Sequence, residues 1–124
     1  KRTIQKKPIN IFGNGKQVRD VLFVNDLTNL LEICQNKMNR CSGDFFNIGG
    51  GESNKISILQ LIQFLEKKLK MQIEVNFKKE RKGDQKYFVN DLQKIKNKLG
   101  WKPKYNLNQG LEYFITWIKK NERI

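Results

Sequence analysis

Residues 57–78 read SILQLIQFLEKKLKMQIEVNFK, and this stretch decides the fold class. Ser57 precedes a run with helical spacing and Gln60 follows three positions later, so the pair predicts a helix opened by a capping box. Residues 73–77 then alternate apolar and polar side chains, which is the period of a half-exposed strand. A helix followed by a strand predicts a mixed α/β unit. The apolar face of the predicted helix comprises Ile58, Leu61, Ile62, Leu65 and Leu69.

Three other short apolar runs predict strands. Pro8 opens an alternation that continues to Phe12, where the sequence GNG ends it. Residues 21–24, VLFV, are short enough for a buried strand. Residues 45–48, FFNI, predict another strand, which stops at three consecutive glycines. We therefore expect about four short strands in the whole chain.

Three further helices follow from the spacing of apolar side chains. We expect Asp26 to cap the first of them, which carries an apolar stripe toward a core. A short helix over residues 92–99 ends at Gly100, and Asn108 is the expected cap of a last helix. The expected stripe of the first helix comprises Leu27, Leu30, Leu31, Cys34 and Met38, and the last helix is expected to bury Leu111, Phe114, Ile115 and Ile118.

Length and composition are those of one globular domain over residues 1–124. Apolar residues make up 38% of the chain and charged residues 30%, so the chain has enough apolar side chains to form a hydrophobic core, and disorder is not expected. No apolar run approaches the roughly 20 residues that cross a bilayer, and no apolar stretch follows the basic N-terminus. Because the sequence begins at Lys1, we expect a piece of a longer protein, although a trimmed chain would look the same.

The few cysteines and the absence of histidine limit the kinds of catalytic and metal sites that the sequence predicts. Cys34 and Cys41 are too few for a disulfide scaffold and suit a reduced, cytoplasmic setting, and Cys34 is expected to be a small buried hydrophobe. Histidine is absent, which removes the commonest general base and the commonest metal ligand. Two cysteines without histidine do not predict a zinc site, so we expect no metal.

The net charge of +13 makes polyanions the obvious partners: nucleic acid, anionic lipid or phosphorylated metabolites. Most of the excess is lysine, scattered on expected helix faces and ends. Solvated surface lysines explain such a pattern without any ligand, because charge patterning alone is weak evidence for one.

Arginine is scarcer, and two arginines lie in glycine-bearing loops. The loop FGNGKQVRD, residues 12–20, contains Arg19, and the polar loop KKERKGDQ contains Arg81. Two planar guanidinium groups converging on one diphosphate would form a clamp that ammonium groups cannot reproduce. Surface ion pairs, Arg19 with Asp20 or Asp26 and Arg81 with Asp84, explain the same residues equally well. The first loop lacks the GK[ST] ending of a Walker loop and the third glycine of a dinucleotide fingerprint.

Four motifs carry a family resemblance when they are taken in order. FGNGKQVRDVLFVNDL, FNIGGGESNKISILQLI, RKGDQKYFVND, and LGWKPK with the later GLEYFITW resemble the C-terminal part of the NAD-dependent epimerase/dehydratases. These are extended short-chain dehydrogenase/reductases that act on nucleotide sugars. KQVRD, NIGGG and GDQ resemble the CDP-paratose 2-epimerases (CDP-tyvelose epimerases) within that family. The likeness runs from about Pro8 to Asn121 and implies a small mixed α/β substrate-binding domain.

The resemblance also implies roles for particular residues. Arg19 and Arg81 would contact the diphosphate of a nucleotide sugar, with a CDP-sugar favoured. Asp84 would hold the ribose or order the loop of Arg81. The base would lie along the stretch that ends at Phe12, and Gln17 would make a polar contact near the nucleotide. The glycines 49–51, with Asp26 and Asn47, match positions that we interpret as structural.

The family's cofactor and catalytic motifs are missing from these residues. The intact enzymes bind NAD through a GxxGxxG loop of a Rossmann domain and use a tyrosine with a lysine four positions later. Here no such glycine loop occurs, and the residues four positions after Tyr87, Tyr105 and Tyr113 are Asp91, Gln109 and Trp117. We therefore expect no catalytic residue and no NAD binding by this chain alone. The Rossmann domain would belong to a missing N-terminal part or a split partner.

An isolated chain of this kind is expected to expose an apolar patch, and so to be a marginal monomer or to associate. A basic nucleic-acid-binding module is the alternative, although nucleic acid is the less favoured partner. Such a module would carry stacking rings on a strand face, whereas most aromatic residues here fall at expected core positions. Trp101 and Trp117 are expected to pack inside. A decayed gene product without function is a third possibility.

Overall fold

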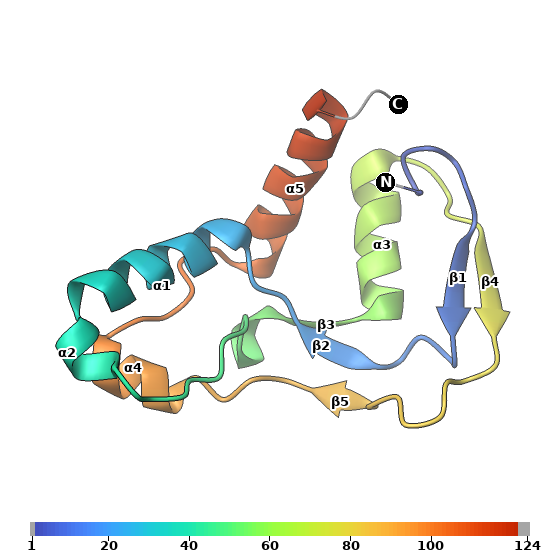
Figure 1. The fold of residues 1–124 in the computed structure, drawn as a ribbon. Helices are drawn as coiled ribbons and strands as arrows, with labels where there is room; N and C mark the ends of the chain where they lie inside the picture. The colour runs from blue at the N-terminus through green and yellow to red at the C-terminus, as the bar shows by residue number, and fades with distance from the viewer. Residues whose placement is uncertain (1, 122–124) are drawn as a thin grey trace. The chain divides into compact units, whose positions relative to one another are not determined.

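A computed structural model describes residues 2–121 of the chain. Its helices and strands confirm the mixed α/β class (Figure 1). The chain divides into two compact units: unit 1 is Lys1–Arg19, Ile56–Phe88 and Ile115–Ile124, and unit 2 is Asp20–Lys55 and Val89–Phe114. In chain order the elements are β1 (Ile9–Phe12), β2 (Val18–Asp20), α1 (Val24–Asn36), α2 (Met38–Cys41), the 3-10 turn η1 (Glu52–Asn54), β3 (Lys55–Ser57), α3 (Ile58–Leu69), β4 (Val75–Lys78), β5 (Tyr87–Phe88), α4 (Gln93–Leu99) and α5 (Leu107–Asn121).

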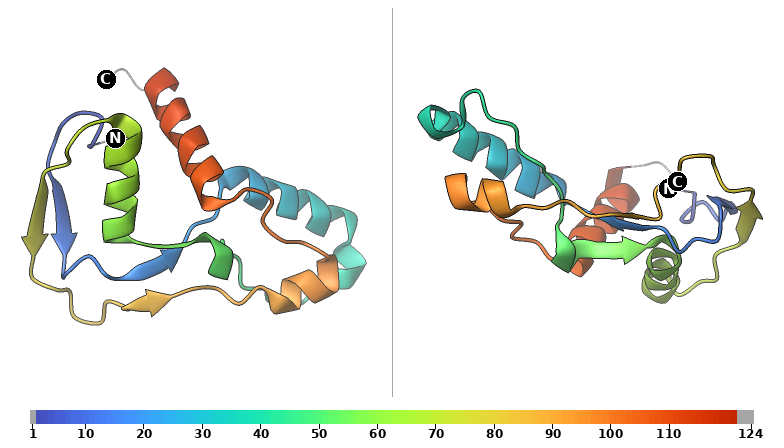
Figure 2. Two further views of the ribbon diagram at one scale, coloured as in Figure 1. Left: turned by 180° about the vertical axis from the view of Figure 1, so that it is seen from behind. Right: turned by 90° about the horizontal axis from the view of Figure 1, so that it is seen from below.

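The core of unit 1 lies between α3 and the parallel pair β1–β4, which run side by side (Figures 1 and 2). Ile11 of β1, Ile62 of α3 and Ile73 just before β4 form its buried centre. The capping box predicted for α3 is confirmed: the Ser57 hydroxyl accepts from the Gln60 amide at 3.2 Å, and the Gln60 side chain accepts from the Ser57 amide at 2.9 Å. Helix, strand and cap therefore agree with the pattern of residues 57–78.

A second sheet has the strand order β3-β2-β5, and β2 pairs in parallel with β5. Residues 21–24 were predicted as a strand, and that prediction is wrong, because β2 ends at Asp20 and Val24 begins α1. The apolar run is buried for a different reason. Leu22 packs against the core of unit 2, and the Phe23 ring packs against aromatic rings of that unit. Periodicity cannot distinguish such a packed connection from a short buried strand.

Unit 2 is built around Trp101, which is 2% exposed, so the prediction that this residue packs inside is confirmed. Leu30 of α1 and Ile95 and Leu99 of α4 complete the buried cluster. Gly100 ends α4 with φ +73°, the left-handed conformation predicted for its C-cap.

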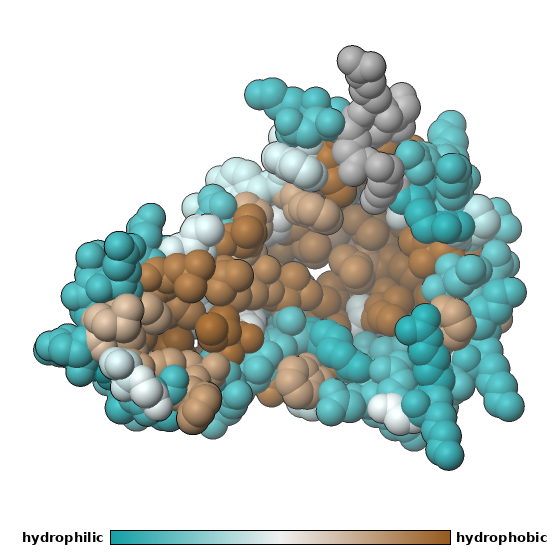
Figure 3. Space-filling view, in the orientation of Figure 1, coloured by the Kyte–Doolittle hydropathy of each residue, from teal (hydrophilic) through white to brown (hydrophobic). Residues whose placement is uncertain are grey.

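The apolar stripe predicted for α1 only partly faces this core. Leu30 is buried, and Ile33 and Cys34 pack against the cluster. Leu27, Leu31 and Met38 are exposed instead, contrary to prediction. Together with Val24, the exposed Leu27 and Leu31 form an apolar α1 surface (Figure 3). The helix has apolar residues on two faces, and sequence spacing does not say which of them the described residues cover.

Two predicted helix caps are wrong. Phe23 precedes α1, and Asp26 is instead buried, accepting from the backbone amides of Lys104 at 2.9 Å and Tyr105 at 3.3 Å. Asp26 thus holds the irregular segment around Lys104 and Tyr105, which precedes α5. The last helix begins at Leu107, where the side chains of Asn106 and Gln109 accept from each other's backbone amides at 2.9 and 3.0 Å. A cap of the same chemistry lies two residues before the predicted Asn108.

Residues 45–48 do not form a strand among the described residues. Phe45 is 88% exposed, whereas Phe46 packs against the core of unit 2. The Phe45 carbonyl accepts from the Lys94 ammonium at 2.8 Å rather than from a neighbouring strand. A strand requires a ladder partner, and an apolar sequence cannot supply one by itself.

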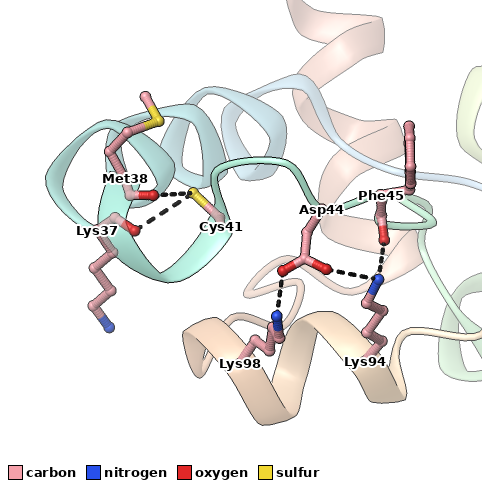
Figure 4. Close-up of polar contacts among 7 residues, drawn as sticks. All are labelled: Lys37, Met38, Cys41, Asp44, Phe45, Lys94 and Lys98. Atoms are coloured by element: carbon pink, nitrogen blue, oxygen red, sulfur yellow. Dashed lines mark hydrogen bonds and ion pairs between the residues drawn. The ribbon is translucent and has the colours of Figure 1, made fainter.

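Two lysines of α4 fix the turn that precedes this segment, as Figure 4 shows. Asp44 forms ion pairs with Lys94, at 3.1 Å, and with Lys98. Hydrogen bonds from Lys98 and then Lys94 lower the pKa of the Asp44 carboxyl from its usual value. The charged form of Asp44 is therefore the one that joins the turn to α4.

We expect Asp44→Asn to destabilise the chain at neutral pH and to have little effect in acid. A carboxyl whose folded-state pKa is lowered stabilises the fold above its unfolded pKa of about 3.9. That contribution disappears as the pH falls through the lower folded-state value. Urea unfolding of both proteins at neutral pH and below both pKa values measures the difference. An equal difference at the two pH values would contradict the assignment.

Candidate functional site

The candidate site lies in unit 1, where two loops leave the same end of a parallel strand pair. Since β1 and β4 are parallel, the loop after Phe12 and the loop after Lys78 start at the same edge of the sheet. A pocket of about 260 Å³ lies between these loops. Its lining comprises Phe12, Gly13, Asn14, Lys16, Gln17, Glu80, Asp84, Gln85 and Lys86.

Arg19 is held at this site by a residue far away in sequence. One Nη atom of Arg19 pairs with Oδ1 of Asp84 at 3.1 Å, and the other donates to the carbonyl of Val18 at 2.8 Å. The side chains of Arg19 and Asp84 are 37% and 29% exposed. The Asp84 amide in turn donates to the Arg81 carbonyl at 3.2 Å, which closes the turn that carries Arg81. Asp84 therefore connects the two arginine loops.

Arg81 lies over the ring of Phe12, with its guanidinium carbon 3.9 Å from the ring centroid. Stacking of this kind is a cation–π contact, and it holds a planar guanidinium in one orientation. Gln17 donates from its side-chain amide to the Phe12 carbonyl at 2.8 Å. These contacts join the end of β1 to the loop that contains Gln17 and to the loop that contains Arg81.

All five residues predicted for the site thus meet in unit 1. Three of them line the pocket, and the two arginines contact lining residues without being part of the lining. The surface ion pairs predicted as the alternative explanation of the two arginines do not form in the part of the chain that the structure describes. Arg19 pairs with Asp84 rather than with Asp20 or Asp26, and Arg81 stacks on a ring. Asp20 instead accepts from the Gly51 amide at 2.9 Å and from the Asn90 side chain.

Sequence reasoning missed several lining residues. Lys16 and Lys86 bring two positive charges to the pocket, and Glu80 and Asp84 bring two negative ones. The lining is therefore balanced in charge, and the two arginines beside it supply the positive excess. Asn14 belongs to the GNG sequence that was predicted to end the strand, and its side chain accepts from the Lys16 amide at 3.0 Å.

Gly15 lets the first loop approach α3 closely. Its φ is +74°, and a Cβ at this position would lie 2.9 Å from the Leu59 side chain. The Leu59 amide donates to the Gly15 carbonyl at 3.0 Å, so backbone contact requires this closeness. The loop is thereby anchored to α3 and presents Lys16 and Gln17 to the pocket.

Most aromatic side chains are more exposed than predicted. Trp117 and Phe114 of α5 are 56% and 53% exposed, so their predicted burial is wrong for this chain. On the strands of unit 1, Phe77 is 58%, Tyr87 54% and Phe88 44% exposed.

The dinucleotide fingerprint does not occur within residues 2–121. A dinucleotide fingerprint needs a glycine loop that joins a strand to a helix N-terminus. The loop at residues 13–15 instead leads from β1 to β2, and the loop at 49–51 leads into the 3-10 turn η1. Within residues 2–121 no group of three or more metal-ligating His, Cys, Asp or Glu side chains occurs. No helix in that range has the length and apolar character needed to traverse a bilayer.

Comparison with known proteins assigns the chain to a family. The family model described as GDP-mannose 4,6 dehydratase matches residues 1–114. CDP-paratose 2-epimerase of Salmonella typhi is 37% identical over 111 residues, which are 90% of this chain and 33% of the relative. The UDP-glucose 4-epimerase of Thermotoga maritima with UDP-glucose superposes with a TM-score of 0.85 at 32% identity, over 96% of this chain and 37% of that one.

A second solved structure is the UDP-glucuronic acid 4-epimerase of Bacillus cereus in complex with UDP-glucuronic acid and NAD. It superposes with a TM-score of 0.87 at 31% identity, over 98% of this chain and 38% of that one. The present chain thus spans about a third of the length of the relatives it matches. It belongs to the family described as GDP-mannose 4,6 dehydratase, among the NAD-dependent nucleotide-sugar epimerases and dehydratases.

Proposed function

We propose that this chain holds the nucleoside diphosphate of a nucleotide sugar within an NAD-dependent sugar epimerase. The observation that carries the proposal is the meeting of Phe12, Gln17, Arg19, Arg81 and Asp84 around one pocket. The two arginines come from loops that are far apart in sequence. Their joint placement supports one shared anionic ligand rather than two unrelated surface charges.

Guanidinium chemistry suits a diphosphate at this place. Each guanidinium carries five N–H donors, and the contacts of Arg19 with Val18 and Asp84 use two of them. The remaining donors can form paired, charge-assisted hydrogen bonds to phosphate oxygens. The stack on Phe12 orients Arg81 before a ligand arrives, which lowers the entropy lost on binding.

Asp84 and Gln17 have supporting roles in this proposal. Asp84 orients Arg19 and closes the turn of Arg81, so it positions both cationic groups. Gln17 fixes the Phe12 carbonyl and hence the end of β1, along which the base would lie. Both residues also line the pocket and can offer polar contacts to the ribose.

The favoured ligand is a CDP-sugar, because the Salmonella typhi relative is named as a CDP-paratose 2-epimerase. UDP-sugars are the competing class, since the two solved relatives contain UDP-glucose and UDP-glucuronic acid. The residues around the pocket are compatible with the diphosphate that both classes share. The identity of the base is therefore part of the test.

The remaining functions of the enzyme belong to residues beyond this chain. NAD and the tyrosine–lysine pair would come from a Rossmann domain, in the same polypeptide or in a split partner. The apolar α1 surface, formed by Val24, Leu27 and Leu31, is the proposed contact with that domain. In this arrangement the chain contributes remote binding energy that positions the reacting sugar carbon.

Nucleic-acid binding is a second candidate, favoured by one observation. Phe77, Tyr87 and Phe88 are exposed on strands of unit 1 in a chain with a net charge of +13. Exposed rings beside basic residues can stack on single-stranded bases. Such binding would depend strongly on salt, because it releases counterions.

Calorimetric titration of the 124-residue chain tests both candidates. The ligands are CDP, UDP, GDP, inorganic phosphate and a single-stranded oligonucleotide. We expect one nucleoside diphosphate to bind more tightly than phosphate, and Arg19→Lys or Arg81→Lys to weaken it about 10-fold, because an ammonium cannot form the paired bonds. Tight, salt-sensitive binding of the oligonucleotide alone would refute the proposal and favour the second candidate.

A further inference from the structure

The two cysteines of unit 2 lie together at a break between helices. A continuous helix would separate residues 34 and 41 by about 10 Å along its axis. Here α1 ends at Asn36, and Lys37 leaves the helical conformation with φ −122° and ψ 35° before α2 begins. The chain turns back, so the Cys41 sulfur lies 3.5 Å from the Cys34 carbonyl oxygen.

The Cys41 thiol has only weak competing contacts. It faces the carbonyls of Lys37 at 3.5 Å and Met38 at 3.8 Å, as drawn in Figure 4. The Cys34 thiol is its neighbour, and, after burial, this nearness contributes to a raised pKa of Cys34. Both cysteines are free thiols, and both residues are of intermediate exposure rather than buried. Because the Cys41 sulfur already lies 3.5 Å from the backbone of Cys34, a bond between the two sulfurs, at about 2.05 Å, requires only local movement.

We propose that Cys34 and Cys41 form a redox-active dithiol, which closes to an intrachain disulfide by exchange with a small-molecule disulfide. In the first step one thiolate attacks a sulfur of oxidised glutathione and releases one glutathione thiolate. In the second step the other cysteine attacks the mixed disulfide and releases the second glutathione. The protein loses two electrons and two protons, and one oxidised glutathione becomes two reduced ones.

The order of attack follows from the surroundings of the two thiols. Burial, and then the neighbouring Cys41, raise the pKa of the Cys34 thiol. The Cys34 thiolate is therefore scarcer than that of an exposed cysteine, which disfavours Cys34 as the first attacking residue. The disulfide would join α1 to α2 across Lys37 and constrain the end of α1, the helix that supplies Leu30 to the core of unit 2.

Packing alone is the competing explanation, because both cysteines contact the cluster of Leu30, Ile95, Leu99 and Trp101. Packing by itself needs no approach of the two sulfurs, so it predicts no greater tendency to form a disulfide in the folded chain than in an unfolded one. The folded-state contact predicts the opposite. The two explanations are distinguished by comparing how readily the two thiols form a disulfide in the folded chain and in the unfolded chain.

The test is equilibration of the 124-residue chain in glutathione buffers of graded composition, natively and in concentrated urea, followed by acid quenching and mass spectrometry. We expect the mass of the native chain to fall by two hydrogen atoms. The quantity compared is the squared concentration of reduced glutathione divided by the concentration of oxidised glutathione at which half of the chain is reduced. We expect this quantity to be about 10-fold higher for the native chain than in urea. An equal or lower native ratio would overturn the proposal.

Single variants complete the test. Cys34→Ser and Cys41→Ser should each gain one glutathionyl group in the same buffers and never lose two hydrogen atoms. Cys41→Ser should gain it more slowly than Cys34→Ser, because burial, the largest cause of the raised pKa of Cys34, remains after the contribution of Cys41 is lost. Mixed disulfides, or disulfide-linked dimers on non-reducing gels, as the main products of the native wild-type chain would also overturn the proposal.

Discussion

Replacing both arginines of the candidate site, in an Arg19→Ala, Arg81→Ala variant, should weaken nucleoside diphosphate binding at least about 100-fold. Hydrogen bonds to charged groups contribute about 1.5–3 kcal/mol each, and about 1.4 kcal/mol corresponds to a factor of ten. The loss should exceed that of either arginine-to-lysine change, because the charge disappears together with the paired donors. Titration calorimetry with the preferred nucleoside diphosphate measures it.

A matched variant separates the site from the net charge. Lys102→Ala, Lys119→Ala also removes two positive charges from the total of +13, but from exposed residues outside the pocket lining. We expect its affinity to change less than about 3-fold, since solvent-exposed charges are screened by salt. If both double variants lost affinity equally, overall charge rather than the two guanidinium groups would explain binding.

The arginine variant also carries a structural consequence that can be checked independently. Without Arg19, the Asp84 carboxylate loses its cationic partner, and the turn of Arg81 loses one of its constraints. The contact is partly exposed, so the expected change in the free energy of unfolding is at most about 1 kcal/mol. Urea unfolding of the variant therefore distinguishes lost binding from lost folding.

Local patterns predicted the parts of the fold that depend on neighbours in sequence. Ser57 and Gln60 are three residues apart, and their reciprocal bonds follow from that spacing alone. Scarcity of arginine in a lysine-rich chain pointed to Arg19 and Arg81, although nothing local indicated their partners. Asp84 lies 65 positions from Arg19 in sequence, so their pairing requires the parallel strands that bring the two loops together.

The wrong predictions of strands and of buried side chains have a common physical cause. Residues 21–24 and 45–48 are apolar and short, but whether such a run becomes a strand depends on a ladder partner elsewhere in the chain. Likewise, Leu31 and Trp117 occupy apolar positions of helices and are nevertheless 59% and 56% exposed. Burial depends on contacts between segments far apart in sequence, which the local spacing of apolar residues does not specify.

The close approach at Gly50 leads to the largest expected effect on stability, from Gly50→Ala. A Cβ at this buried position would lie 2.1 Å from the carbonyl oxygen of Val21 and 2.8 Å from the Cβ of Asn54. The obstructing oxygen belongs to the backbone, so relief requires moving the segment that also bonds the Val21 amide to the Asn54 carbonyl at 3.0 Å. We expect a loss of about 3 kcal/mol or more in the free energy of unfolding, or no cooperative transition at all.

Gly43→Ala is the matched control, because it separates steric conflict from backbone strain. Gly43 has φ +76° and open space around the position of a Cβ, so alanine there should cost only about 1–2 kcal/mol through its left-handed conformation. Urea unfolding followed by circular dichroism compares the two variants directly. A cost for Gly50→Ala no greater than that for Gly43→Ala would mean that the connection between β2 and α1 can yield. The glycine run at 49–51 would then be needed for something other than this close backbone contact.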